Sequence, residues 1–420
     1  MENNLDNRKP CIEIMVALLL MARVIELCAE SVVTSIRGLS GLMVIVRPIE
    51  EIIYLVGFVL LVVFYFNHSY EERIKSHTLL KTFFLVCGMV VVYAFTSANN
   101  AFIVSNFRGV FFKILIYGAI FYFAASITVD YNKVFYYLRF GVVLSIIYGF
   151  ISALVLNLDY MVIASVILLH TMVAYHLYKS TSEMKYFLLF VVLCGLIAVA
   201  GSRGALLWLI VFYLMYNICL ARGITKKGVI VVVVLLLGLF FSVAFQTEII
   251  SILIRLFPNS RTIEMLALSN IADDSSRSNI WSFFINEISQ NPFKIHGLFA
   301  DRAAINQTFM NTNKLGYWIT ETRSYSYAHD LFLEILYDFG VVIGGFISVK
   351  IVLLVVRIIR FAKETDDINE AGFYIVIVVY GFLMLLISDS FLLNVYFWFF
   401  LGLINKVPKR KRFRIGEIYL

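Results

Sequence analysis

Long apolar runs limit the possible folds of this sequence more than any other feature. Runs of roughly 16 to 25 apolar residues recur along the chain, and a helix needs about 20 such residues to cross the hydrocarbon core of a bilayer. Only 15% of the residues are charged, whereas a soluble domain has about 25%. The runs lack the alternating pattern of a membrane β-barrel. The sequence therefore predicts an all-α integral membrane protein.

About twelve membrane-spanning helices are predicted, with a long polar segment between the ninth and the tenth. An interfacial or re-entrant segment is expected over 31–46, because Arg37 and Gly38 divide it. The predicted organisation is nine spans within 1–246, a loop over 247–329, three spans within 330–406 and a basic tail over 407–420. The spans themselves are residues 12–29, 49–66, 79–97, 110–128, 134–157, 159–178, 186–200, 203–220, 228–246, 330–356, 372–388 and 390–405.

The basic residues indicate the orientation of the chain in the membrane. Lysine and arginine gather in alternate short loops and most densely in the tail from Lys406 to Arg414. Cytoplasmic loops are enriched in these residues, so both termini are predicted to be cytoplasmic and segment 247–329 to lie on the opposite side. A net charge of +7 distributed in this way gives no reason to expect nucleic acid as a partner.

The segment 247–329 is predicted to be a folded loop. It is far longer than the usual connection of about 4–6 residues, and its acidic and basic residues balance. None of the five cysteines lies in it, so a disulfide-stapled module is not expected. Apolar residues recur at near-helical spacing between Ser278 and Gln290, which predicts a helix there with Ser275 or Ser276 as its cap.

Arg203, within Gly201-Ser202-Arg203-Gly204, is the first candidate functional residue. It begins a span on the loop side, where the amides of a helix N-terminus and a guanidinium together bind phosphate well. The alternative is an interfacial arginine that extends to water without a binding role.

Arg277 and Trp281 form the second candidate pair. They are four residues apart, so both project from one face of the predicted helix. Arginine beside an aromatic ring is a common surface for phosphate and sugar. The alternative is an exposed helix start with a buried tryptophan.

His329 is the third candidate, at the point where the long loop enters the tenth span. The positive end of a helix disfavours the imidazolium form, so a neutral imidazole able to accept a proton is predicted. The alternative is a loop histidine with no role. His296 is a weaker second candidate.

No metal or cofactor site is predicted. The sequence contains no Asp-x-Asp, no P-loop and no zinc-ligand spacing.

Taken in chain order, these motifs resemble those of the O-antigen ligase/polymerase superfamily. The resemblance covers about residues 195–345. It rests on Ser202-Arg203-Gly204, Arg277, Trp281, Asn291-Pro292, Gly297, His329, Glu334-Ile335-Leu336 and Gly340. It implies a fold similar to that of lipid-dependent, GT-C type glycosyltransferases, with the loop in the periplasm and the spans in the bacterial inner membrane.

The resemblance also implies the chemistry. Members of this superfamily act on undecaprenyl-pyrophosphate-linked glycans. Arg203 and Arg277 would bind the donor pyrophosphate and stabilise the charge as it leaves. His329 would position the acceptor hydroxyl or receive its proton. Direct displacement would invert the anomeric carbon, with no metal and no cofactor.

Within the superfamily, the pattern around Gly297 and His329 favours a repeat-unit polymerase over a ligase that transfers the glycan to lipid A–core. The resemblance leads us to expect Asn after the histidine, whereas this chain has Asp330, and an acid there would raise the pKa of the imidazole. Further substrate-binding candidates are Arg302, Arg323, Trp281 and Tyr327, the last two as rings that stack on sugars.

A polysaccharide flippase is the rival from another class. It would require polar residues near the middle of several spans and often inverted repeats. The polar content is concentrated in one loop instead, which favours an enzyme. A chain-length regulator is an additional partner compatible with a polymerase.

Overall fold

The structure is a computed structural model, and every regular element among its described residues is a helix. It describes residues 10–36, 40–67, 84, 88, 112–127, 129–152, 160–200, 202–220, 248, 251–252, 255, 275–309, 328–386 and 390–407. The longer helices are α1 (Pro10–Ser35), α3 (Ile49–Asn67), α7 (Gly118–Ser126), α8 (Tyr131–Ile151), α9 (Tyr160–Thr181), α10 (Met184–Ala200), α11 (Arg203–Leu220), α15 (Ser275–Gln290), α16 (Ala300–Phe309), α18 (Leu331–Glu364), α19 (Ile368–Gly381) and α20 (Val395–Gly402). The short ones are η3 (Ser40–Leu42), α2 (Met43–Val46), η4 (Phe112–Tyr117), η7 (Leu383–Leu386) and η8 (Leu403–Asn405).

The prediction of an all-α membrane protein is confirmed. Within the described residues, four helices are long and apolar enough to cross a membrane, and shorter apolar helices accompany them. The four cover Tyr131–Ile151, Val162–Thr181, Leu331–Glu364 and Ile368–Leu386. The predicted spans 79–97 and 228–246 fall almost wholly outside the described residues, so the number twelve and the GT-C architecture stay predictions.

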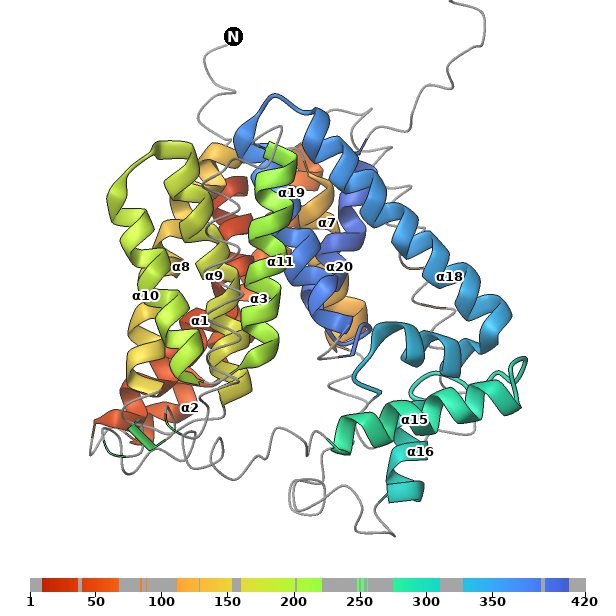
Figure 1. Ribbon diagram of the computed structural model, residues 1–420. Coiled ribbons are helices and arrows are strands. Elements are labelled where there is room, and N and C mark those ends of the chain that lie inside the picture. Colours follow the sequence, from red (N-terminus) through yellow and green to blue (C-terminus); the bar gives the residue numbers. More distant parts are fainter. Residues whose placement is uncertain are drawn as a thin grey trace, which may run out of the picture.

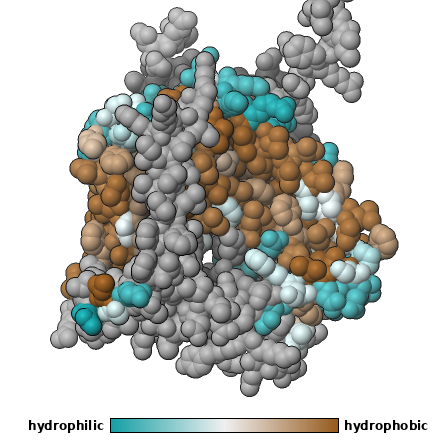
Figure 2. Space-filling view, viewed as in Figure 1, coloured by the Kyte–Doolittle hydropathy of each residue, from teal (hydrophilic) through white to brown (hydrophobic). Residues whose placement is uncertain are grey.

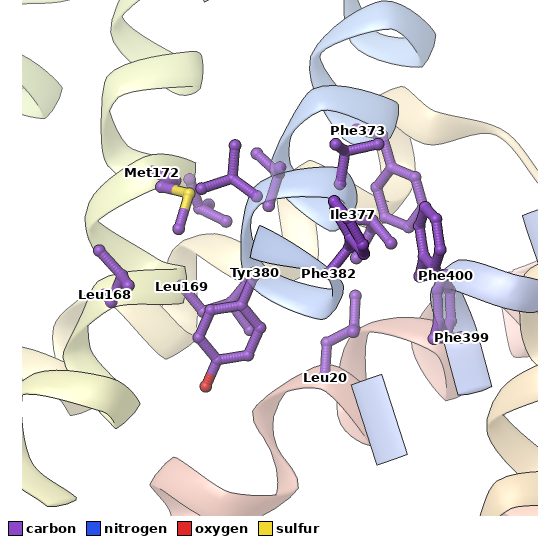
Figure 3. Close-up of a cluster of buried hydrophobic side chains, with 14 of the residues drawn as sticks. Leu20, Leu168, Leu169, Met172, Phe373, Ile377, Tyr380, Phe382, Phe399 and Phe400 are labelled. Atoms are coloured by element: carbon purple, nitrogen blue, oxygen red, sulfur yellow. The ribbon is translucent and has the colours of Figure 1, made fainter. Parts of the chain in front are cut away.

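The helices pack around α19 in one large apolar core. Nearly every residue of α19 is buried, as expected for a helix that is apolar on all its faces. Figure 3 shows Phe373, Ile377 and Tyr380 of α19 among side chains from α1, α9 and α20. A core that joins helices from both ends of the sequence makes the bundle one unit.

Polar contacts inside the bundle define its two ends. His176 of α9 contacts Asn369 at the start of α19 (3.0 Å) and Tyr216 late in α11 (2.7 Å). We call this the tail end. Tyr380, late in α19, donates to the Ser165 carbonyl early in α9 (3.1 Å). Because Tyr216 lies at the tail end, the start of α11 at Arg203 lies at the opposite end, where α15 and α16 are also found (Figure 1). We call that the loop end.

The helix α18 departs from the predicted span 330–356. It extends to Glu364 but bends sharply at Gly340, whose φ is +71°. The bend exposes backbone groups to a loop segment: the Val341 N–H donates to the Pro292 carbonyl (2.8 Å) and the Gly297 N–H to the Asp338 carbonyl (3.0 Å). A Cβ on Gly340 would lie 3.1 Å from the Lys294 carbonyl oxygen. Glycine is therefore required for two reasons: its positive φ, and the close approach of the Lys294 carbonyl, which leaves no room for a Cβ.

We expect Gly340→Ala to lower the free energy of unfolding by about 1–3 kcal/mol, because it adds left-handed backbone strain and a contact with the Lys294 carbonyl. Gly345→Ala is the matched control, since a Cβ there meets nothing within 4 Å and the residue is helical. Thermal unfolding of both variants in detergent measures the difference. Equal melting temperatures for the two would contradict the proposed role of the bend.

Other predicted boundaries require correction. Residues 31–35 belong to α1, where the Ser35 hydroxyl donates to the Ser31 carbonyl (2.7 Å). Short polar side chains are tolerated in a helix when they bond back in this way. The loop helix α15 begins at Ser275, not at Ser278, so Ser275 and Ser276 are helical residues and not its caps. The last predicted span starts too early, because Asn394 caps α20.

Candidate functional site

The described part of the long loop has its own small apolar core. Ile280 and Phe284, one helical turn apart on α15, are buried against Ile305 of α16 and Tyr337 of α18. The rings of Phe284 and Tyr337 lie 4.8 Å apart, edge to face. The two loop helices are therefore packed on the first part of α18, as Figure 1 shows at the loop end.

A short segment between the loop helices, which we call the strap (Asn291–Phe299), completes this packing. Its His296 ring stacks on Tyr337 at 4.0 Å and contacts the Tyr337 carbonyl through Nδ1 (3.0 Å). Burial of His296 lowers the pKa of its imidazole, which favours the neutral form. The Phe299 N–H donates to the Asp338 carboxylate (3.0 Å). These contacts give His296, the weaker histidine candidate, a structural role.

His329 is held between two fixed neighbours. Ala328 donates its N–H to Asp301 (3.0 Å) and accepts the indole N–H of Trp281 at its carbonyl (3.1 Å). On the other side, Asp330 caps α18 by accepting the Leu333 N–H (2.9 Å). His329 itself has φ +54°, a left-handed conformation that is uncommon for a residue with a side chain. Such strain persists where surrounding contacts impose it, and it concentrates at functional sites.

Asp330 has a clear local role. Its carboxylate is the N-cap of α18, and an asparagine side chain would accept the same bond. Burial raises the pKa of the Asp330 carboxyl. The departure from the expected Asn therefore preserves the capping.

A buried cluster of acids is connected to the residue before His329, because Asp301 accepts the Ala328 N–H, and sequence reasoning did not assign this cluster a role. Asp301, Glu334 and Asp338 are all buried, and Ser390, before α20, donates to Glu334 (2.5 Å). Burial raises the pKa of Asp301, and the nearby charge of Arg302 opposes this shift. Glu334 and Asp338 are four residues apart on an apolar helix, and this spacing is the sequence signal that could have identified them. Their partners are distant in sequence and could not be inferred.

Arg302, a predicted substrate-binding residue, belongs to this cluster. Its side chain is buried, its guanidinium lies 5.4 Å from the centre of the Phe299 ring, and its charge acts on both Asp301 and Glu334. An arginine among buried carboxylates compensates their charge.

Of the other predicted site residues, the structure describes some only by their place in a helix and others not at all. Arg203 is the first residue of α11, after Ser202, whose hydroxyl accepts the Ala205 N–H (3.5 Å). Arg277 is the third residue of α15. The side chains of both lie outside the described residues, as do the whole of Arg323 and Tyr327. The structure joins Trp281 to the residue preceding His329, and it places Arg203 at the same end of the bundle.

The three predicted catalytic residues share one feature of position. Arg203 and Arg277 lie in the first turn of a helix, and His329 comes two residues before α18 begins. Helix N-termini carry partial positive charge and unpaired N–H groups, which favour bound anions. Within the described ranges, no group of three or more His, Cys, Asp or Glu side chains is placed to hold a metal ion.

This architecture defines a multi-pass helical membrane protein with a folded loop module packed on one end of its bundle. Residues 188–349 match the family model described as O-antigen ligase. Over this stretch, the match supports the predicted resemblance to the O-antigen ligase/polymerase superfamily. None of the curated proteins compared with the chain matches it. The family match supports a glycosyl-transferring enzyme with lipid-linked glycan substrates.

The contact between Trp281 and Ala328 yields a test of what the tryptophan does. We expect Trp281→Phe to lower kcat for glycan transfer several-fold and to leave KM nearly unchanged. A phenylalanine ring would still offer a flat face to a sugar, whereas the Ala328 carbonyl loses its hydrogen-bond donor, at a cost of about 1–3 kcal/mol. Steady-state kinetics with a lipid-linked repeat unit measures both constants. A rise in KM alone would show that the indole acts on the substrate.

Proposed function

We propose that this protein joins undecaprenyl-pyrophosphate-linked oligosaccharide repeat units into O-antigen or capsular polysaccharide at the periplasmic face of the bacterial inner membrane. Both termini are then cytoplasmic, and the loop end faces the periplasm. The family match supports glycosyl transfer in general. The choice of polymerase comes from the residues around Gly297 and His329.

The placement of His329 is the observation that carries the proposal. The histidine precedes the N-terminus of α18 in a strained backbone conformation. Contacts of its neighbours with α15, with α16 and with the first turn of α18 maintain this conformation. Its side chain is partly exposed and not fully buried. A base held on a rigid frame at a positively polarised helix start suits proton transfer beside a pyrophosphate.

The proposed reaction is a direct displacement. The acceptor hydroxyl oxygen forms a bond to the anomeric carbon of the donor glycan, and the bond from that carbon to the pyrophosphate oxygen breaks. The electron pair leaves with the pyrophosphate, and the hydroxyl proton passes to His329. Arg203 and Arg277 bind the pyrophosphate and stabilise its increasing charge. Attack opposite the leaving group inverts the anomeric carbon.

An O-antigen ligase is the second candidate, and it shares the matched family with the polymerases. The two functions share the displacement chemistry and differ only in the acceptor, which is lipid A–core for the ligase. A flippase would use none of this chemistry.

The electrophoretic pattern of surface polysaccharide, with and without the gene, tests the proposal. A polymerase deletion leaves single repeat units attached to lipid A–core, whereas a ligase deletion leaves none attached. Unchanged O-antigen with loss of capsule identifies a capsule polymerase, and here too a chain-length regulator would set the modal length. Repeat units trapped on the cytoplasmic leaflet would overturn the proposal in favour of a flippase.

A further inference from the structure

The strap exposes apolar side chains at its tip. Phe293 is 77% exposed, Ile295 is 48% exposed, and Lys294 between them is exposed as well. The tip is firmly attached to the bend of α18, because Val341 donates to the Pro292 carbonyl and the backbone of Phe293 and Lys294 lies close against Gly340. Removing large apolar side chains from water is favourable, so this fixed tip is suited to an apolar environment.

The same bend begins an apolar stripe on α18. Val342 and Phe346 are 66% and 63% exposed, and Val349, Leu353 and Val356 continue the exposed face. The spacing is that of one side of a helix, and α18 is among the helices apolar enough to cross a membrane. Figure 2 shows a hydrophobic band in this region, with hydrophilic residues above and below it. A band of this kind is suited to face the acyl chains of a bilayer.

We propose that Phe293, Lys294 and Ile295 form a membrane anchor that enters the bilayer leaflet at the loop end. The two apolar side chains lie among the upper acyl chains, and the Lys294 ammonium extends to the lipid phosphates. Lipid is the occupant because the tip is continuous with the lipid-facing stripe: the bilayer that covers Val342 begins where the tip is attached.

The anchor has a mechanical consequence for the site. The strap that carries the tip also bonds to the Asp338 carbonyl through Gly297 and to its carboxylate through Phe299. The strap therefore connects the tip to the acid cluster through these contacts with Asp338. If the proposed function holds, the anchor fixes the height of His329 above the membrane, where the pyrophosphate of a lipid-linked donor lies.

Fluorescence quenching tests the depth of the tip. A bimane label is attached to Phe293→Cys, Ile295→Cys, Val342→Cys and Ser282→Cys in the full chain, reconstituted in nanodiscs of phosphatidylcholine and phosphatidylglycerol. A nitroxide on the upper acyl chain is the quencher, and wild-type protein treated in the same way corrects for the native cysteines. Val342 is the lipid-facing reference, and Ser282, exposed on α15, is the water-facing one.

Quenching at Phe293 and Ile295 is expected to approach that at Val342 and to exceed that at Ser282 at least about threefold, as for an interfacial anchor. If quenching at both tip positions is no stronger than at Ser282, the proposed membrane anchor is wrong. The tip would then face water or a protein partner. The measurement needs no substrate, so its outcome is independent of whether the chain polymerises glycans. All four side chains are partly or fully exposed, so their replacement leaves the core intact.

Discussion

Replacing His329 with asparagine is expected to reduce the rate of chain lengthening by a factor of about 10²–10⁴, the usual contribution of a positioned base. The reason is that the imidazole is the only group of this residue able to accept the acceptor's proton. Asparagine tolerates the left-handed conformation that His329 adopts at φ +54°, so the frame around it should persist. Incorporation of labelled, lipid-linked repeat units by reconstituted protein measures the rate.

Asp330→Asn is the matched control for this prediction. The asparagine carbonyl oxygen replaces the carboxylate that accepts the Leu333 N–H, so α18 keeps its cap and activity should be retained. His329→Gly is a second variant, since glycine relieves the backbone strain yet removes the imidazole. Activity within a few-fold of wild type in both His329 variants would exclude the histidine as the base.

The second large effect is expected at the two arginines. Arg203→Ala and Arg277→Ala should each lower the rate of transfer by about 10²–10³, the range found when a donor to a developing anion is removed. Arg→Lys at either position should recover only part of this, because lysine retains the charge without the two-pronged geometry. The double alanine variant should lose less than the product of the single losses if, as proposed, both side chains act on one pyrophosphate.

Arg255→Ala provides the control for the arginines. Arg255 is an exposed basic residue of the same loop, so its removal changes the net charge equally and should leave the rate unaffected. Arg302→Ala should behave differently from both, lowering the amount of folded protein, because it leaves Asp301 and Glu334 without their compensating charge. Wild-type rates for Arg203→Ala and Arg277→Ala would refute the proposed pyrophosphate site.

The fold class followed from sequence because membrane insertion depends on local composition. A run of apolar residues of bilayer length forms a helix regardless of its neighbours. The predicted span 203–220 coincides with α11, since Ser202 is a good cap at the membrane surface. The helix α15 was also visible, because Ile280, Phe284 and Ile288 follow the helical period that a packed face requires.

The site around His329 needed the tertiary structure. Sequence spacing pointed to the histidine, yet its left-handed backbone depends on contacts with Asp301 and Trp281, which no local pattern encodes. The exposed tip at Phe293 is likewise defined only by the bend at Gly340.

The sequence by itself determined that the chain is a membrane protein and that it is built of helices. It also supplied the residue types that can bind phosphate and accept a proton. Each of these depends on composition and short-range period, which are properties of neighbouring residues. The tertiary structure alone decided that Asp301, Glu334 and Asp338 share one buried cluster, which is bonded to the residue before His329. Several segments that are distant in sequence together shield this cluster from water. They also place Arg302 and Ser390 next to its carboxyl groups, which makes the burial of these acids tolerable.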